Sequence, residues 1–386
     1  MLRPYDACQM RILDKVMKAL ELENVTKSYQ VVRTLPGKGG GHPLGLRNLT
    51  RFFLGETFSV LGTRTVTTIP ALDGVSFAIE PGQVVGLFGK NGSGKTTLLS
   101  ILGGVFPQDS GTVRCFGHDL RTDLYEVRKY VVPIFGWLDA ITWAFTGRQN
   151  IEKFLIMHHV DPTSVTDQVD ELAREIGLGD RLDDRAARYS QGMRIQIQVI
   201  AAILLYRARG HSLLLLDEPF LGLDVFSQRY LRDFVRHRMR GDDFSMILAT
   251  HQCRDIEEIC DEVIVLDKGK IIARDSVDDM RQRVGKAETI QIEYVMPEGR
   301  PLPDRFFRRE GVLEQRMHRH DGRTELSLLV EDSRATLAWL VGALAQAGCH
   351  LTALRTRAMN LEDALVQLIA RSHVIERSDV IEGVTQ

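Results

Sequence analysis

The sequence lacks long apolar runs. The longest, Val199 to Tyr206, is far shorter than the roughly 20 residues that a bilayer-spanning helix requires. The first twenty residues have no apolar stretch of the kind found in a signal peptide, and Met17 is an equally good start of translation. We therefore expect a soluble chain whose role at a membrane, if it has one, depends on a partner.

The sequence also lacks an excess of charge of one sign and lacks paired cysteines. Its 49 basic and 51 acidic residues give a formal net charge of -2, so we expect no nucleic-acid partner. The cysteines are scattered and form no metal-type CxxC pair. We expect reduced thiols in a cytosolic protein. The five are Cys8, Cys115, Cys253, Cys260 and Cys349.

What is present is an alternation of short apolar runs and helical patterns, in a chain long enough for two domains. A buried run, VVGLF, leads into a glycine loop, and similar runs return at SLLLLDEP, SMILATH and EVIVLDKG. Helical patterns dominate between Asp123 and Ala208. This alternation predicts an α/β fold with a mainly parallel sheet and helices on both faces.

Beyond residue 284 the pattern changes. A strand, a short helix and a hairpin around Asp321–Gly322 are followed by a helix capped at Asp332 and ended by Gly348. Another strand and a final helix, NLEDALVQLIA, complete the segment. The order βαββαβ predicts a small ferredoxin-like α+β domain over residues 288–372.

The glycine loop GKNGSGKT, which follows a buried strand and opens a helix, predicts binding of a nucleotide phosphate. Glycines let backbone N–H groups surround phosphate oxygens, and the helix N-terminus favours negative charge. Lys95 would reach the β and γ phosphates, and Thr96 would offer its hydroxyl to Mg²⁺. The predicted ATP-binding residues here are Gly89, Lys90, Asn91, Gly92, Ser93, Gly94, Lys95, Thr96 and Thr97.

A second motif, Asp217-Glu218-Pro219, ends the apolar strand Ser212–Leu216. An acidic residue at the end of a strand beside such a loop is where Mg²⁺ needs a second protein ligand, so Asp217 is predicted to bind the metal. Glu218 would point at the γ-phosphate and act as the general base on the attacking water.

With these motifs in this order, the chain resembles the ATP-binding subunits of ABC transporters. Tyr189-Ser190-Gln191-Gly192-Met193 lies between them, where that family has a signature close to LSGGQ. Of that signature, this chain keeps only the serine, Ser190, and the second glycine, Gly192. The resemblance implies that they grip the γ-phosphate of the opposite subunit's ATP, and that the active unit is a dimer closed over two nucleotides.

The resemblance implies further roles. Asp224, in Gly222-Leu223-Asp224, would lie in the D-loop at the dimer interface. His251 would be the switch histidine at the γ-phosphate, and Tyr29 would stack on adenine. The family's glutamine between loop and signature is missing: our alignment places Trp137 there, with Asp139 or a water as a replacement ligand. We expect slower or more tightly gated hydrolysis.

The implied architecture is an ABC cassette with a RecA-like core, an antiparallel β subdomain and a helical subdomain. We expect an N-terminal extension at 1–19, the cassette at 20–283 with an insert at about 31–64, the C-terminal domain, and a tail at 373–386. The C-terminal domain would serve dimerisation or regulation, since it is unlike the β-sandwich of some polysaccharide exporters.

The resemblance implies an ATP-hydrolysing motor at the cytoplasmic face of the membrane, forming a homodimer or a heterodimer with a paralogue. It would drive a separate permease that exports a lipid or drug-like amphiphile. One alternative is a polysaccharide or glycoconjugate exporter, and another is a soluble regulatory ABC ATPase. Residues 137–157, rich in Trp, Phe and Ile, are either the permease contact or helical-subdomain core.

Overall fold

The structure is a computed structural model that describes most of the cassette and most of the segment that follows it. The described residues are 17–34, 64–135, 141–239, 244–284, 288–296, 302–307, 309–320, 323–330, 332–358, 361–365 and 368–369. Most of the predicted extension at 1–19, residues 35–63 of the predicted insert, Trp137, Asp139 and the tail at 373–386 lie outside them.

The centre of the fold is a six-stranded sheet of order β10-β9-β3-β8-β7-β6, in which β9, β3, β8, β7 and β6 run parallel. The four central parallel strands are short apolar runs, as predicted for strands covered on both faces. The strands are β3 (Val84–Phe88), β6 (Val131–Phe135), β7 (Leu213–Asp217), β8 (Ser245–Thr250), β9 (Glu262–Asp267) and β10 (Lys270–Ser276). β6 lies inside the stretch for which we expected helices, and its pairing with β7 explains the difference.

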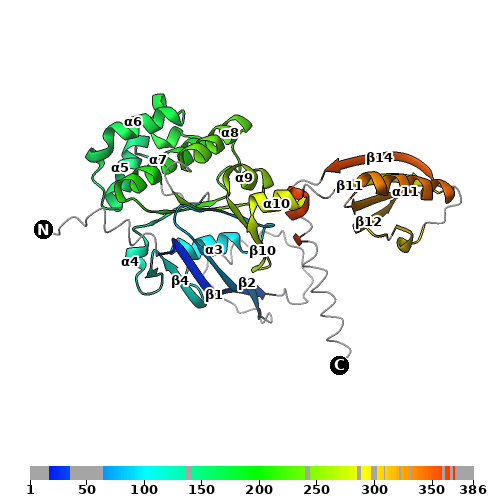
Figure 1. The fold of residues 1–386 in the computed structure, drawn as a ribbon. Coiled ribbons are helices and arrows are strands. Elements are labelled where there is room, and N and C mark those ends of the chain that lie inside the picture. Colours follow the sequence, from blue (N-terminus) through cyan, green and yellow to red (C-terminus); the bar gives the residue numbers. More distant parts are fainter. Residues whose placement is uncertain are drawn as a thin grey trace, which may run out of the picture.

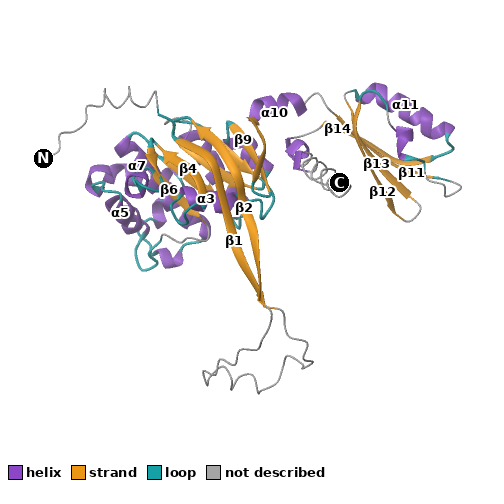
Figure 2. Ribbon diagram, turned by 90° about the horizontal axis from the view of Figure 1, so that it is seen from below, coloured by secondary structure: helices purple, strands orange, loops and turns teal. Residues whose placement is uncertain are grey.

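An antiparallel sheet of order β2-β1-β4-β5 lies on one side of the central sheet, and helix α3 (Lys95–Leu102) packs between the two (Figure 1). Leu98, Leu99 and Ile101 of α3 are fully buried there. β1 and β2 form a long ribbon that pairs as far as Thr34 and Arg64 (Figure 2). The strands are β1 (Leu20–Thr34), β2 (Arg64–Ile79), β4 (Ser110–Cys115) and β5 (His118–Asp119).

Helices cover the opposite face of the central sheet, where a second apolar core joins them to its strands (Figure 1). They are α5 (Gly147–Met157), α6 (Thr166–Glu175), α7 (Gln191–Arg209), α8 (Val225–Phe234), α9 (Cys253–Ile259) and α10 (Val277–Val284). The short α4 (Leu124–Val127) lies instead beside β5 and packs into the core around α3. Short 3₁₀ turns lie at Pro162–Val165, Gly179–Arg181 and Ala186–Arg188, and a π turn at Val235–Met239.

A separate antiparallel sheet of order β12-β13-β11-β14 follows α10 and has its own apolar core. Its elements are β11 (Glu288–Val295), β12 (Val312–His320), β13 (Arg323–Val330), α11 (Ser333–Gln346) and β14 (His350–Ala358), and the expected first helix is only a 3₁₀ turn at Asp304–Phe307. β12 and β13 pair up to His320 and Arg323; Asp321 and Gly322 lie outside the described residues. The Asp332 side chain caps α11, as predicted.

The final helical residues, 361–365 and 368–369, do not join the core of this last sheet. Leu361, Leu365 and Ile369 are at most 2% exposed and belong to the apolar core of the cassette instead. The bounds predicted for the domains remain a prediction, but this packing places part of the predicted C-terminal domain in the cassette core.

Candidate functional site

The predicted catalytic residues follow the carboxyl ends of three neighbouring parallel strands. The glycine loop follows Phe88 of β3, His251 follows Thr250 of β8, and Glu218 follows Asp217 of β7. Phe88 pairs with Thr250, and Asp217 with Ala249, so the three ends lie side by side. Ligands of open α/β sheets bind at such a carboxyl edge.

The glycine loop passes so close to its neighbours that two of its positions leave no room for a side chain. A Cβ at Gly89 would lie 2.3 Å from the Leu266 carbonyl oxygen and 2.6 Å from Ser93 Oγ. Gly94 has a φ of 109°, and a Cβ there would lie 2.5 Å from the Ala71 carbonyl oxygen. Glycine is therefore required at Gly89 by the lack of space, and at Gly94 by both the lack of space and the backbone conformation.

Lys95 is buried at the first turn of α3, with its ammonium directed back to the loop. Its Nζ donates to the Gly89 carbonyl at 2.6 Å and lies 3.9 Å from Glu218 Oε1. Burial lowers the pKa of Lys95, while Glu218 and Asp217 act in the opposite direction. The ammonium thus sits between the loop and the carboxylates, where a phosphate would also meet it.

Glu218 and His251 contact each other directly. His251 Nδ1 lies 2.8 Å from Glu218 Oε1 and donates to this carboxylate, which can only accept when ionised. Glu218 adopts the left-handed region, with φ at 49°, while its N–H donates to the Ala249 carbonyl. A non-glycine residue there costs on the order of 1 kcal/mol, and such strain is concentrated at functional sites.

The donors at this edge fit ATP with Mg²⁺. Thr96 is exposed at the first turn of α3, which follows β3, and Asp217 ends β7, one strand beyond the neighbouring β8. A hydroxyl and a carboxylate, both ligands that Mg²⁺ prefers, therefore lie at the same edge of the sheet. Ser93 Oγ is buried without a hydrogen-bond partner in the described part of the chain. An unsatisfied buried hydroxyl in a glycine loop is suited to a phosphate oxygen. The individual roles of these residues remain predictions.

The predicted signature lies in the helical subdomain, at the start of α7. Ser190 caps this helix by accepting from the Met193 N–H at 3.3 Å. Gly192 is buried, and a Cβ there would lie 3.2 Å from Leu223 Cδ2. The signature therefore abuts the segment that follows Glu218, although its proposed target is a nucleotide on another subunit.

Two other predicted residues have local structural partners. Asp224 caps α8: its carboxylate accepts from the N–H groups of Phe226 and Ser227, both at 3.0 Å, and from the Ser227 hydroxyl. These bonds lower the pKa of Asp224. Tyr29 pairs with Ile69 on the β1–β2 ribbon and is 38% exposed. Their roles at the nucleotide remain predictions, as does that of Trp137.

Sequence reasoning missed two groups that adjoin the site. The Tyr189 hydroxyl reaches into the helical subdomain, and Asp255 forms a buried ion pair behind Thr250 and His251. Asp255 lies four positions after His251, on a short helix with an apolar face. A charged residue in this position could have indicated a buried polar contact. The partner of Asp255 is 23 residues away in the sequence, at Arg232, so spacing alone does not reveal it.

Comparisons with known proteins concern the family and the fold. Residues 72–221 match the family described as ABC transporter. The chain is 33% identical to an uncharacterized ABC transporter ATP-binding protein, YdbJ of Bacillus subtilis, over 55% of this chain and 67% of that protein. It is 29% identical to the daunorubicin resistance ATP-binding protein DrrA2 of Streptomyces coeruleorubidus, over 81% of this chain and 94% of that one.

The fold also matches a solved structure. A dimeric ATP-binding cassette in a post-hydrolysis state, bound to ADP and Pi, superimposes with a TM-score of 0.51 at 19% identity. The match covers 67% of this chain and 98% of that one. At this identity the likeness concerns the fold. None of the helices in the described part of the chain has the length and apolar character needed to cross a bilayer.

Proposed function

Because this chain belongs to the ATP-binding proteins of ABC transporters and is an ATPase of that family, we propose that it is the motor of an exporter. Two copies, or one copy and a paralogue, close over two ATP molecules and drive separate permease subunits at the cytoplasmic face of the membrane. The observation that carries this proposal is the contact of Glu218 with both His251, at 2.8 Å, and Lys95, at 3.9 Å.

The chain's own residues account for hydrolysis. Glu218 takes the proton of the attacking water, and the His251 N–H holds this carboxylate in place. Lys95 and the loop N–H groups stabilise the charge that develops on the phosphate. Mg²⁺, held by Thr96 and Asp217, would add positive charge at the phosphate oxygens. The left-handed conformation of Glu218 sets its direction before the substrate arrives.

ABC cassettes dimerise, and exposed apolar side chains support a dimer face beside the D-loop. Leu221 is 51% exposed, Val225 75% and Phe226 87%, so they would be buried if two cassettes met there. Ser190 and Gly192 of one copy then meet the γ-phosphate held by Lys95 of the other. In this proposal Asp224 keeps the D-loop in shape by capping α8.

A second exposed apolar region supports contact with a permease. Trp143 and Phe145, before α5, are 48% and 40% exposed, and Ile156 and Met157, at its end, are 61% and 69% exposed. They belong to the 137–157 segment predicted as this contact. Ile151 and Leu155 of the same segment are buried in the core. In this proposal the segment therefore contributes both to the permease contact and to the core of the helical subdomain.

The proposed cargo is a lipid or drug-like amphiphile, supported by the likeness to a protein named for daunorubicin resistance. A polysaccharide or glycoconjugate exporter is the alternative, which the segments ITWAFTGRQNI and YSQGM favour. For the last sheet we propose a ferredoxin-like module. In its order β12-β13-β11-β14, β13 lies between β11 and β12, and β11 lies between β13 and β14. The connections from β11 to β12 and from β13 to β14 each pass one intervening strand, as in a split βαβ unit.

Two experiments test the proposal. Glu218→Gln should lower kcat for ATP at least about 100-fold while ATP binding is retained, because only the general base is lost. Glu23→Gln, at an exposed carboxylate of β1, is the control and should leave kcat unchanged. Equal rates for the two variants would contradict the assigned chemistry. Independently, a tagged chain should co-purify with a polytopic protein from detergent-solubilised membranes; its absence would favour a soluble regulatory ATPase.

A further inference from the structure

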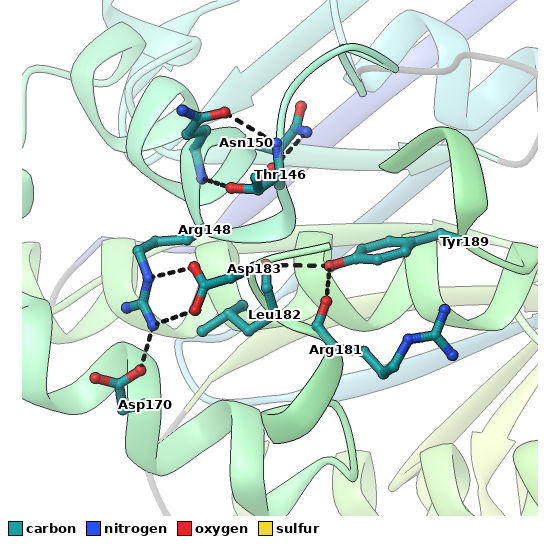
Figure 3. Close-up of polar contacts among 9 residues, drawn as sticks. Thr146, Arg148, Asn150, Asp170, Arg181, Leu182, Asp183 and Tyr189 are labelled. Carbon is teal, nitrogen blue, oxygen red and sulfur yellow. Dashed lines mark hydrogen bonds and ion pairs between the residues drawn. The ribbon is translucent and has the colours of Figure 1, made fainter. Parts of the chain in front are cut away.

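Tyr189, directly before the predicted signature serine, is turned into the helical subdomain and is only 6% exposed. Its hydroxyl donates to the Arg181 carbonyl at 2.6 Å and also lies 3.2 Å from the Leu182 carbonyl oxygen (Figure 3). Burial raises the pKa of this phenol. An apolar side chain would fill the same space but would leave the 181–182 turn without this donor.

The first residue of α5 makes room for this hydroxyl. A Cβ at Gly147 would lie 2.4 Å from Tyr189 Oη and 2.8 Å from the Leu182 carbonyl oxygen. The start of α5 is otherwise fixed by a capping box between Thr146 and Gln149. The tyrosine and the glycine are therefore complementary in shape, although 42 residues separate them in the sequence.

Arg148, the second residue of α5, binds the same turn from the other side. Its backbone N–H donates to the Leu182 carbonyl at 3.1 Å, so this carbonyl faces both α5 and the Tyr189 hydroxyl. Its side chain reaches Asp183 at 2.9 Å and Asp170 of α6 at 2.7 Å (Figure 3). Both carboxylates raise the pKa of Arg148, which stays charged. The turn 181–183 is thus held between α5, α6 and Tyr189.

On its other side, Tyr189 continues into Ser190, whose backbone lies in the extended region at φ -64° and ψ 166° and which caps α7. A peptide unit of fixed geometry joins the two residues. The anchored tyrosine ring and the start of α7 therefore fix the position of Ser190 from both directions. A displacement of α5 would move the Leu182 carbonyl and, with it, the tyrosine.

We propose that Tyr189 is a positioning residue for the ATPase reaction. Its hydroxyl ties Ser190 to the start of α5 through the 181–183 turn, so the position of α5 sets the position of the signature. This inference rests on the proposed function, in which Ser190 meets the partner's nucleotide and the α5 region contacts the permease. The inference adds Tyr189 as the residue that connects the permease contact at α5 with the signature at Ser190.

The test compares variants of the full-length chain that carry single substitutions. For each variant, kcat and KM for ATP hydrolysis are measured. Tyr189→Phe removes only the hydroxyl and should lower kcat about tenfold with a smaller change in KM, because the Lys95 loop is untouched. Tyr230→Phe is the matched control: its hydroxyl also donates to a backbone carbonyl of this subdomain, that of Glu175. Because Tyr230 is 44% exposed, the control should lose less stability than Tyr189→Phe and should keep its kcat.

A double-mutant cycle then asks whether Tyr189 acts through α5. Arg148→Gln should lower kcat, and combining it with Tyr189→Phe should add little, because both act on the same turn. Combining it with Tyr230→Phe should give additive effects. Additivity in the first pair would overturn the connection to α5.

Ser190→Ala separates failure of this inference from failure of the proposed function. If Ser190→Ala lowers kcat and Tyr189→Phe behaves like Tyr230→Phe, the positioning role is wrong and the signature stands. If Ser190→Ala leaves kcat unchanged, the signature assignment and the positioning role both fall. The supporting result is a loss of kcat in both variants, with melting temperatures that keep both folded at the assay temperature.

Discussion

Arg232 and Asp255 form an ion pair whose side chains are only 3% and 1% exposed, with the Arg232 terminal nitrogen 2.8 Å from Asp255 Oδ1. Asp255 also accepts from the Thr250 hydroxyl at 3.0 Å, and the guanidinium lies 5.1 Å from the centre of the Phe220 ring. The pair therefore joins α8 to α9 behind the two segments that carry Glu218 and His251.

Removing one member of this pair should be costly. Burial raises the pKa of Asp255, against the pull of Arg232, and Asp255→Ala would leave the guanidinium buried with less compensation. We expect a loss of about 3–5 kcal/mol in the free energy of unfolding, measured by urea denaturation. Asp233→Ala breaks an exposed pair with Arg229 and should cost less than about 1 kcal/mol. Similar losses in the two variants would refute the buried-pair interpretation.

The glycine loop gives a prediction about space. Gly89→Ala would place a methyl group 2.3 Å from the Leu266 carbonyl, which is backbone and cannot swing away. We expect loss of ATP binding in a titration with a fluorescent ATP analogue. Gly342→Ala in α11 meets nothing within 4 Å and should bind normally, with a gain of up to about 1 kcal/mol in stability. Normal ATP binding by Gly89→Ala would mean that the loop has room to move.

His158 gives a prediction about pH. Burial, with Arg209 nearby, lowers its pKa from 6.5 to about 4. The unfolded chain thus takes up this proton near pH 6.5 and the folded chain only near pH 4. Stability from this residue is complete above pH 6.5, falls as the pH is lowered, and levels off below about pH 4. The loss should be about 1–3 kcal/mol, since the ring is only partly buried.

His158→Phe should remove this part of the pH dependence while keeping the contact with the Phe154 ring, whose centre is 4.4 Å away. The measurement is the free energy of unfolding at pH 7 and pH 4.5 in both proteins. His159→Asn removes the neighbouring ring, which is bonded to Tyr125 and is the smallest cause of the lowered His158 pKa, and should retain most of the wild-type dependence. An unchanged pH slope in His158→Phe would rule out His158 as its source.

The last helical residues should stabilise the cassette rather than the sheet before them. Leu365 is fully buried in the cassette core, so Leu365→Ala should cost about 2–4 kcal/mol and speed amide exchange in α9. Leu340→Ala, at an equally buried leucine of α11, should instead speed exchange in β11 and β13. Exchange that rises in the same elements in both variants would contradict two separate cores.

The parts predicted from the sequence are those determined by short segments. GKNGSGKT carries its own geometry because glycine, lysine and threonine act within eight residues. The hairpin of β12 and β13 and the cap of α11 are local in the same way. Four strands of the central sheet, β3, β7, β8 and β9, were visible as apolar runs, because strands buried on both faces need no polar side chain.

The parts that were not predicted depend on distant partners. β6 contains Pro133 and is only five residues long, so its pairing with β7, about eighty residues later, decides its structure. The contact of Tyr189 with Gly147 and the Arg232–Asp255 pair are likewise settled by tertiary packing. A buried tyrosine or aspartate needs a hydrogen-bond or ion-pair partner, but the sequence spacing of these residues does not identify that partner.

The return of residues 361–365 and 368–369 to the cassette core changes what a truncation means. Ending the chain after α10 would remove both the four-stranded sheet and three side chains that fill the cassette's own core. Joining α10 directly to residue 361 would remove the sheet alone. The sheet is thus an insertion in the cassette. Exchanging it for another module would require two junctions, one after α10 and one before residue 361, rather than one.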